Sequence, residues 1–215
     1  MQQEGCFSCY HLTMNEQTSI AQKIYTAQGI TKENVFSEMK VVRLGCGKSK
    51  LKGAIGVDSL RLPGVDVVHD LDSFSWPFED ASVDIIFAHS VLERLGSVPH
   101  VFEEMWRIGK NGARVVVTVP YFRSVDAFVD PTHTHFFTSG SLDYFIEGEN
   151  SLSNYEYTKH KFRKTGFWYG WPQSSRNPFA RIFKKYIHAH PWLYDQYLSL
   201  LFPMKILVWE LEIIK

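Results

Sequence analysis

Two histidines in a loop rich in acidic and hydroxyl side chains are candidates for proton transfer. His133 and His135 lie in the segment DPTHTH, and Tyr121 and Asp126 precede it. An imidazole titrates near neutral pH, so either histidine suits the removal of a proton from an acceptor hydroxyl. We therefore name His133, His135 and Tyr121 as catalytic candidates. The alternative is that both histidines only hold this loop against the rest of the fold.

The same loop has the spacing of a metal site. Asp130 with His133 and His135 offers one carboxylate and two imidazoles, which is a workable ligand set for a divalent cation. Local spacing of three residues is a loose signal, and the Cys6, Cys9 and His11 cluster has no evident fourth ligand. We predict no metal site in this chain.

A glycine-rich turn and a carboxylate follow two neighbouring apolar runs. Gly45-Cys46-Gly47 follows residues 41–44 directly, and Asp58 ends the run 54–58, with Ser59 beside it. Glycine leaves the main chain bare, so that a ligand can lie against it. A carboxylate at the end of the next strand can accept hydrogen bonds from both hydroxyls of a ribose.

A second acidic residue follows the third apolar run. Asp70 comes directly after residues 65–69, and Leu71 and Phe74 are close to it in sequence. The Asp70 carboxylate can accept a hydrogen bond from a purine amino group, and the two apolar side chains can flank the purine ring. Together with the glycine turn, this pattern predicts a nucleoside site at one edge of a parallel sheet.

The turn favours an adenosyl group over a dinucleotide. A dinucleotide site needs a third small residue three positions after Gly47, at the start of a helix that receives the pyrophosphate. That position is Lys50, and residues 45–53 leave hardly any room for a helix. A nicotinamide-dependent oxidoreductase is therefore disfavoured.

The elements that must hold these residues alternate along the chain. Five β-branched runs predict buried parallel strands, at residues 41–44, 54–58, 65–69, 82–88 and 114–119. The apolar positions of residues 98–108 predict a helix between the last two of these strands. The connections 45–53 and 59–64 are too short for ordinary helical crossovers, so we expect loops there. We expect the first 39 residues to cover that face of the sheet.

The rest of the chain predicts further elements. We expect helices at residues 16–28, 139–145 and 177–201, and a strand with a glycine kink at 159–169. Residues 205–215 alternate as a final strand. This strand has one wholly apolar face (Leu207, Trp209, Leu211, Ile213) and one face that carries two acids (Ile206, Val208, Glu210, Glu212).

Three segments of this chain resemble the successive motifs of class I S-adenosylmethionine (SAM)-dependent methyltransferases. They are VVRLGCGKSKLKGAIGVD, HDLDSFSWPFEDASVDIIFAHSVLERL and GARVVVTVPYF. A compact bacterial-type subgroup is similar in its Gly-Val-Asp strand, its Asp-Pro-Thr-His loop and its Glu-Leu-Glu ending. The resemblance covers residues 40–215.

This resemblance implies a fold, a cofactor and a set of binding residues. The fold is a Rossmann-like α/β sheet with helices on both faces, strand order 3-2-1-4-5-7-6 and an antiparallel last strand in sequence. The cofactor is SAM, which would donate its methyl group to an acceptor. From the basic insert described below, we expect this acceptor to be a small sugar-like or anionic molecule. The residues that contact the cofactor are Gly45, Cys46, Gly47, Asp58, Ser59, Asp70, Leu71, Ala88 and His89. The last two lie beside the sulfonium end.

A basic and aromatic insert precedes the final strand. Between Glu156 and Asp195 the chain has eight Lys or Arg residues, no acidic residue and many aromatic residues. Three interpretations stay open: a solvated basic face over a small aromatic core, a site for an anionic acceptor, or a peripheral membrane surface. Nucleic acid is disfavoured because the whole chain is neutral, with 23 basic and 23 acidic residues.

Composition sets the remaining expectations. Three cysteines are too few for a fold built on disulfides, and the first residues have neither a basic nor an apolar region of a secretory signal. We expect a cytoplasmic protein with an N-terminal extension at residues 1–39 and a SAM-binding domain at 40–215. Within this domain, residues 157–203 form the acceptor-side strand and lid. The oligomeric state is not predicted, and a non-catalytic SAM-binding scaffold is the alternative to the methyltransferase.

Overall fold

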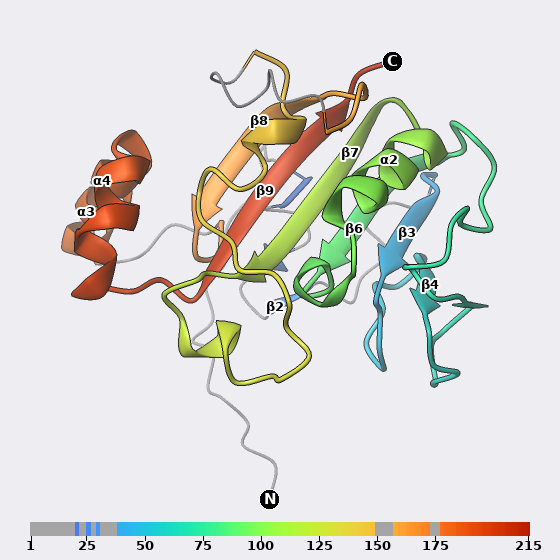
Figure 1. Cartoon of the computed structure of the whole chain (residues 1–215), viewed down its shortest axis with the longest axis horizontal. Coiled ribbons are helices and arrows are strands. Elements are labelled where there is room, and N and C mark those ends of the chain that lie inside the picture. Colours follow the sequence, from blue (N-terminus) through green and yellow to red (C-terminus); the bar gives the residue numbers. More distant parts are fainter. Residues whose placement is uncertain (1–19, 22–24, 27–28, 31–37, 149–156, 173–176) are drawn as a thin grey trace, which may run out of the picture.

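The computed structural model describes residues 20–21, 25–26, 29–30, 38–148, 157–172 and 177–215 (Figure 1). Its centre is a seven-stranded sheet in the order β5-β4-β3-β6-β7-β9-β8. The strands are β3 (Val41–Leu44), β4 (Ile55–Asp58), β5 (Val67–Val68), β6 (Val83–His89), β7 (Gly109–Pro120), β8 (Phe162–Tyr169) and β9 (Ile206–Ile213). Within this sheet, β9 runs antiparallel to both of its neighbours, β7 and β8, and the other paired strands are parallel. The predicted strand order and the reversed last strand are confirmed.

Helix α2 (Val98–Ile108) covers one face of the sheet (Figure 1). Its apolar stripe, which includes Val101, Met105 and Ile108, is fully buried against the strands. Strand β7 begins directly after the helix, at Gly109, five residues earlier than predicted. A Cβ at Gly109 would collide with Cδ1 of Ile213 and would lie 3.0 Å from the Met105 carbonyl oxygen, so glycine allows close packing where the helix passes into the strand.

The two faces of the sheet carry separate apolar clusters, as the alternation of β9 predicts. Leu207 and Trp209 belong to the larger cluster, on the α2 side. Ile206 and Val208 belong to the smaller cluster on the opposite side. Glu210 lies on that opposite side and is buried.

The N-terminal part of the chain contributes to this opposite face. The connections at residues 45–54 and 59–66 contain turns and no helix, as predicted. Ile20 and Ala21 are helical, and Ala21 is fully buried in the smaller cluster. Their backbone N–H groups donate to the Glu210 carboxylate at 3.2 and 3.0 Å, a favourable place for a negative charge on a helix. These two residues supply part of the expected cover.

The predicted helix at residues 16–28 is wrong in its last turn. Strand β1 (Tyr25–Thr26) pairs antiparallel with β2 (Gly29–Ile30). Aromatic and β-branched residues favour extended backbone, and this pairing overrides the helical spacing of the sequence.

The C-terminal insert is two helices and not one. It consists of α3 (Pro178–Ala189), α4 (Pro191–Gln196) and the 3₁₀ turn η5 (Leu198–Leu200), and it lies at the β8 end of the sheet (Figure 1). The predicted helix breaks because Pro191 has no N–H and keeps His190 out of the helical conformation. The predicted helix at residues 139–145 is reduced to the turn η3 (Asp143–Phe145). The predicted glycine kink in β8 is confirmed as a register shift between Lys164 and Gly166.

Candidate functional site

Three parallel strands, β3, β4 and β6, end close together at one edge of the sheet. Leu44, the last residue of β3, pairs with Val57 on one side and with Ala88 on the other. The next residues along each strand, Gly45 and Asp58 among them, therefore reach the carboxyl edge together. This is the edge at which open α/β sheets bind their ligands.

The two glycines of the first turn have different roles. Both have left-handed backbone, with φ of +56° at Gly45 and +53° at Gly47, a region that favours glycine. A Cβ at Gly45 would lie 2.6 Å from Cγ2 of Val91, whereas a Cβ at Gly47 would have no atom within 4 Å. Gly45 is thus required by packing, and only Gly47 presents bare main chain to open space.

Asp58 lies beside this open position. One of its carboxylate oxygens accepts a hydrogen bond from the Gly47 N–H at 2.8 Å, and the other accepts from the Leu60 N–H at 3.1 Å. Asp58 is only half buried. A carboxylate oxygen has two lone pairs, so each oxygen retains the capacity to accept one ribose hydroxyl. The residues at this edge therefore fit the ribose of an adenosyl group.

Cys46 and Ser59 lie on either side of this cradle. The Cys46 side chain is buried, and a Cβ at Gly56 would lie 2.8 Å from its sulfur. Burial, with the charge of Asp58 as the next contribution, raises the pKa of the Cys46 thiol. Only the main chain of Cys46 can therefore face a ligand. Ser59 is exposed directly after Asp58.

The predicted adenine contacts follow β5. Asp70 is exposed, and one of its oxygens accepts from the Asp72 N–H at 3.1 Å, so the other is open to a ligand. Leu71 is buried, and its carbonyl accepts from Trp76 Nε1 at 3.1 Å, which fixes the turn. Phe74 is 45% exposed, close enough in the chain to cover a ring held by Asp70.

His89 is held as a neutral ring at the end of β6. Its ring stacks on those of Phe87 and Trp171, with centroids 5.9 and 6.0 Å apart. Burial and the nearby Arg43 charge lower the pKa of His89 to about 4. The next residue, Ser90, has φ of +51°, a strained conformation for a side chain other than glycine. His89 therefore shapes this edge through packing and not through proton transfer.

His133 holds the loop that follows β7. Its side chain is 4% exposed, and Nδ1 lies 3.0 Å from the Ala127 carbonyl, so Nδ1 must donate. Its Nε2 lies 3.9 Å from both Glu93 Oε1 and Asp130 Oδ2. A ring so enclosed suits positioning, and the interpretation that this histidine pins the loop is supported for His133.

Glu93 is a buried carboxylate beside the His133 loop and was not among the residues predicted for the site. This residue lies in the 3₁₀ turn η1 (Leu92–Arg94), is 1% exposed, and neither carboxylate oxygen has a hydrogen-bond partner among the described residues. Burial raises its pKa, and the His133 charge opposes that effect. His89 ends β6, whereas Glu93 faces His133. The sequence could not indicate this role of Glu93, because the burial of its carboxylate becomes visible only in the fold.

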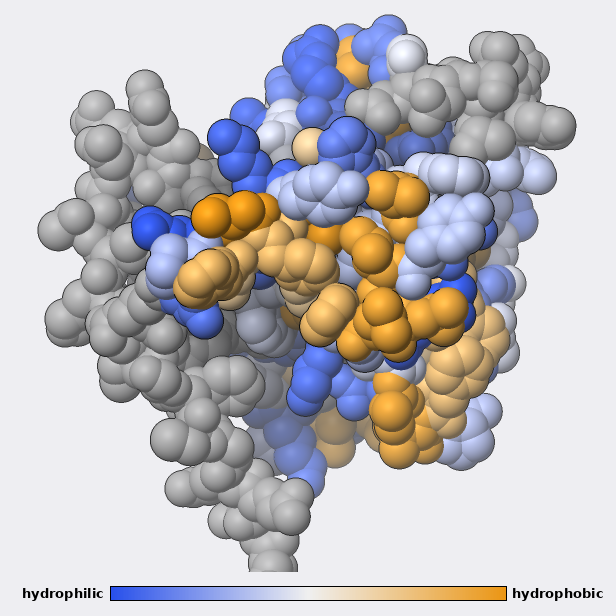
Figure 2. All heavy atoms as spheres, turned by 90° about the vertical axis from the view of Figure 1, so that its left-hand side faces the viewer, coloured by the Kyte–Doolittle hydropathy of each residue, from blue (hydrophilic) through white to orange (hydrophobic). Residues whose placement is uncertain are grey.

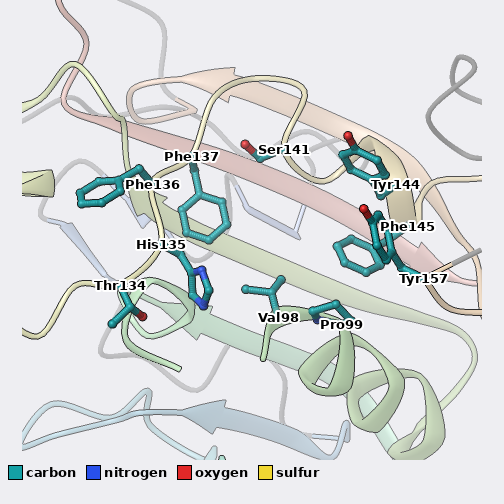
Figure 3. A pocket seen from close by; sticks show the side chains of 10 residues that line it. All are labelled: Val98, Pro99, Thr134, His135, Phe136, Phe137, Ser141, Tyr144, Phe145 and Tyr157. Atoms are coloured by element: carbon teal, nitrogen blue, oxygen red, sulfur yellow. The ribbon is translucent and has the colours of Figure 1, made fainter. Parts of the chain in front are cut away.

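His135 faces a pocket next to the same turn. The Thr134 and His135 N–H groups donate to the Glu93 carbonyl at 2.8 and 3.1 Å, which fixes the loop on η1. His135 Nε2 is buried and has no hydrogen-bond partner among the described residues. The pocket has a volume of about 320 Å³ and lies between the start of α2 and the turn η3 (Figure 3). It is lined by Val98, Pro99, Thr134, His135, Phe136, Phe137, Ser141, Tyr144, Phe145 and Tyr157.

Tyr121, the third catalytic candidate, lies inside the fold and contacts the C-terminal insert. Tyr121 is fully buried, and its hydroxyl donates to Asp195 Oδ1 at 2.8 Å. Tyr169 donates to the same oxygen at 2.7 Å, and the Ser139 N–H and hydroxyl donate to Oδ2 at 3.0 and 2.7 Å. Burial raises the pKa of Tyr121 far above its usual value. Tyr121 and Asp195 therefore fasten the C-terminal insert to the end of β7.

The metal alternatives find no support in the described residues. Within them, no three His, Cys, Asp or Glu side chains converge closely enough to hold a cation. The Cys6, Cys9 and His11 cluster lies outside the described ranges. No helix in the described part of the chain is long and apolar enough to cross a bilayer.

Comparisons with known proteins agree with this geometry. Residues 43–117 match the family model of a methyltransferase domain. An S-adenosylmethionine-dependent methyltransferase from Mesorhizobium loti is 14% identical, with 81% of this chain and 90% of that chain covered and a TM-score of 0.51. The YcgJ protein from Bacillus subtilis is also 14% identical, with 83% and 93% covered and a TM-score of 0.51. No curated protein sequence matches the chain.

A third solved structure shows how far the fold is shared. The cyclase SpnF is 14% identical, with 85% of this chain and 77% of that chain covered and a TM-score of 0.51. Such low identities show the fold alone. The methyltransferase-domain match spans residues 43–117, and the strand order and the Gly47–Asp58 cradle agree with the fold and the cofactor edge of class I SAM-dependent methyltransferases.

Proposed function

We propose that this methyltransferase transfers the methyl group of SAM to a hydroxyl group of a small, uncharged acceptor that binds in the His135 pocket. The observation that carries the proposal is the buried, unpartnered Nε2 of His135 at the wall of this pocket. A buried nitrogen without a hydrogen bond is costly unless a ligand satisfies it.

The pocket lining supports an uncharged acceptor with an apolar or ring face. Its walls are mainly aromatic, with Phe136, Phe137, Tyr144, Phe145 and Tyr157 around His135 (Figure 3). None of the lining residues is a lysine, arginine, aspartate or glutamate. Aromatic rings suit planar phenols and the apolar faces of sugars, whereas an anionic acceptor would lack a cation here. We therefore propose the sugar-like or phenolic class over the anionic class.

The cofactor supplies an activated methyl group with its own leaving group, so the protein has three tasks. Gly47 and Asp58 would hold the ribose, and Asp70 with Leu71 would hold the adenine. The loop fixed on η1 would position the acceptor and exclude water from it. His135 Nε2 would accept the hydroxyl proton as the oxygen becomes a nucleophile.

His135 and His133 have separate roles in this proposal. His133 is committed to the Ala127 carbonyl through Nδ1 and faces Glu93 through Nε2, so it holds the loop. His135 is bound to η1 only through its backbone, which leaves its ring for the acceptor.

A transfer assay with labelled SAM tests this assignment. Purified protein would be incubated with separate panels of phenols, neutral sugars and phosphorylated sugars. We expect product from a neutral panel, and a loss of about 10² in kcat for His135→Gln, the typical contribution of a general base. The affinity for SAM should not change in this variant.

Two outcomes would overturn the proposal. Undiminished turnover in His135→Gln would exclude proton transfer by this residue, and product only from the phosphorylated panel would exclude an uncharged acceptor. SAM binding without product from any panel would instead support the non-catalytic scaffold.

A further inference from the structure

We propose that the C-terminal insert docks this enzyme onto an anionic membrane surface. The docking surface is a cationic aromatic face, which we define as the exposed apolar and basic residues of segment 177–205. The apolar members are Phe179, Ile182, Tyr186, Trp192, Tyr197, Leu200, Leu201 and Phe202, and the basic members are Arg181, Lys185 and Lys205.

Helix α3 is apolar on two sides. Its inner side packs on the domain, where Ile187 is fully buried. Its outer side presents Phe179, Ile182 and Tyr186 at positions i, i+3 and i+7, and these are 80%, 68% and 44% exposed. A stripe with this spacing ordinarily faces a core. Here it faces away from the protein, which points to an apolar partner outside it.

The segment after α3 extends this surface. Trp192, Tyr197, Leu200, Leu201 and Phe202 are all at least 59% exposed. Figure 2 shows hydrophobic side chains gathered on the side of the molecule that carries α3 and α4. Large contiguous apolar patches are rare on soluble monomers and mark interaction sites.

The charges of the segment favour anionic lipid. Arg181, Lys185 and Lys205 are exposed, whereas Lys184 donates to the Trp171 carbonyl. The one acidic residue in 177–205 is Asp195, which is buried. Lysine and arginine beside an apolar helix face attract the headgroups of anionic lipids, and tryptophan and tyrosine favour the membrane interface.

A second copy of the chain fits this surface less well. A two-fold contact brings the same patch of both copies together, so the basic residues would face each other with no exposed acid of the segment to pair them. A lipid surface supplies the opposite charge to all of them at once.

The face is held rigidly from beneath. Asp195 accepts hydrogen bonds from Tyr121 and Tyr169, and the Tyr194 hydroxyl donates to the Phe202 carbonyl at 2.9 Å. These contacts use the inner side of the insert. Substitutions on the outer side should therefore leave the fold intact.

Vesicle binding by the full-length protein tests the proposal. The vesicles would contain either phosphatidylcholine alone or phosphatidylcholine with phosphatidylglycerol, and bound protein would be measured by flotation. We expect binding to the anionic vesicles and at least about tenfold weaker partitioning for Arg181→Glu/Lys185→Glu, since each basic residue near such a surface contributes strongly. Ile182→Gln/Leu201→Gln should weaken binding by a similar factor because it removes buried apolar area.

Matched variants outside segment 177–205 serve as controls. Lys52→Glu/Lys159→Glu makes the same change in net charge, and Val125→Gln/Val129→Gln removes residues that are 78% and 71% exposed elsewhere. Both should partition like the wild type. Brominated lipid should quench the fluorescence of Trp192, and Trp192→Phe should lose this quenching while it still binds.

Three results would overturn the membrane assignment. They are absence of binding to anionic vesicles, equal binding to neutral vesicles, and a concentration-dependent dimer in sedimentation that Ile182→Gln/Leu201→Gln abolishes. SAM affinity should be measured on the same variants. Normal SAM binding together with any of these results would overturn the membrane assignment alone and leave the methyltransferase assignment intact.

Discussion

The Asp58 carboxylate accepts a hydrogen bond from the Gly47 amide at 2.8 Å and so joins the end of β4 to the turn after β3. The left-handed backbone of Gly47 aims this amide at the carboxylate, and the space above it is open. The cradle is thus preformed, which lowers the entropic cost of binding a nucleoside.

The two glycines of the turn should respond differently to alanine. We predict that Gly47→Ala costs about 1 kcal/mol in the free energy of unfolding, the cost of a left-handed alanine, and also weakens SAM binding. Gly45→Ala should cost about 2–4 kcal/mol, because its methyl group also collides with Val91. Urea unfolding of both variants measures this difference.

The double variant Gly45→Ala/Val91→Ala provides the control. Removal of the two Val91 methyl groups should recover part of the Gly45→Ala loss, as a coupling energy between the two sites, while the contact with Cβ of residue 91 remains. Equal costs for the two glycine substitutions would show that the collision with Val91 relaxes without penalty.

Asp195 should stabilise the insert through its buried hydrogen bonds. Tyr121→Phe removes one donor to this charged acceptor, and we predict a loss of about 2 kcal/mol in unfolding free energy. The affinity for SAM, measured by calorimetry, should stay within twofold. Tyr197→Phe, at a 59% exposed position, is the matched control and should change neither quantity. A Tyr121→Phe protein of wild-type stability would contradict the anchoring role.

Glu93 should lower the stability of the protein at neutral pH. Burial raises the pKa of this carboxyl, so the folded state holds the proton more tightly than the unfolded state. Its contribution to stability is then favourable at low pH and is lost as the pH rises through the folded pKa. We predict that Glu93→Gln gains about 1 kcal/mol at pH 7 and that the gain shrinks toward pH 4. A destabilised variant at pH 7 would show that attraction to His133 outweighs the cost of burial.

His89 should make the fold sensitive to acid. Its pKa falls to about 4 in the folded state from the usual histidine value of 6.5, so between these values the unfolded state binds a proton that the folded state does not. Stability is therefore full above pH 6.5 and falls by about 3 kcal/mol as the pH approaches 4. His89→Phe retains an aromatic ring between Phe87 and Trp171 and should lack this loss. Parallel slopes for the two proteins from pH 7 to 5 would contradict the assignment.

The sequence predicted the central sheet and the cofactor edge because both depend on local patterns. Buried parallel strands are continuous β-branched runs, and the ends of such runs meet at one edge. Gly47 and Asp58 directly follow or end such runs, so the sequence alone predicts that they are neighbours in space. The alternation of β9 likewise assigned Leu207 and Val208 to opposite faces.

The parts that sequence could not predict depend on contacts between distant segments. Asp195 is 74 positions from Tyr121, and no pattern links them. In the sequence, Glu93 resembles an ordinary surface residue of a turn. Its burial arises only when the His133 loop folds over it. His133 and His135 also differ in role because the loop directs the ring of His133, and not that of His135, toward the Ala127 carbonyl.

Calorimetric titration with SAM and S-adenosylhomocysteine tests the central claim most directly. We predict binding of both ligands by the wild type, and an affinity lower by about 1–3 kcal/mol in Asp58→Ala, the cost of losing a charged hydrogen-bond partner. Glu79→Ala, which removes an exposed carboxylate elsewhere, should bind like the wild type. No heat with either ligand, or equal affinity in wild type and Asp58→Ala, would contradict the account.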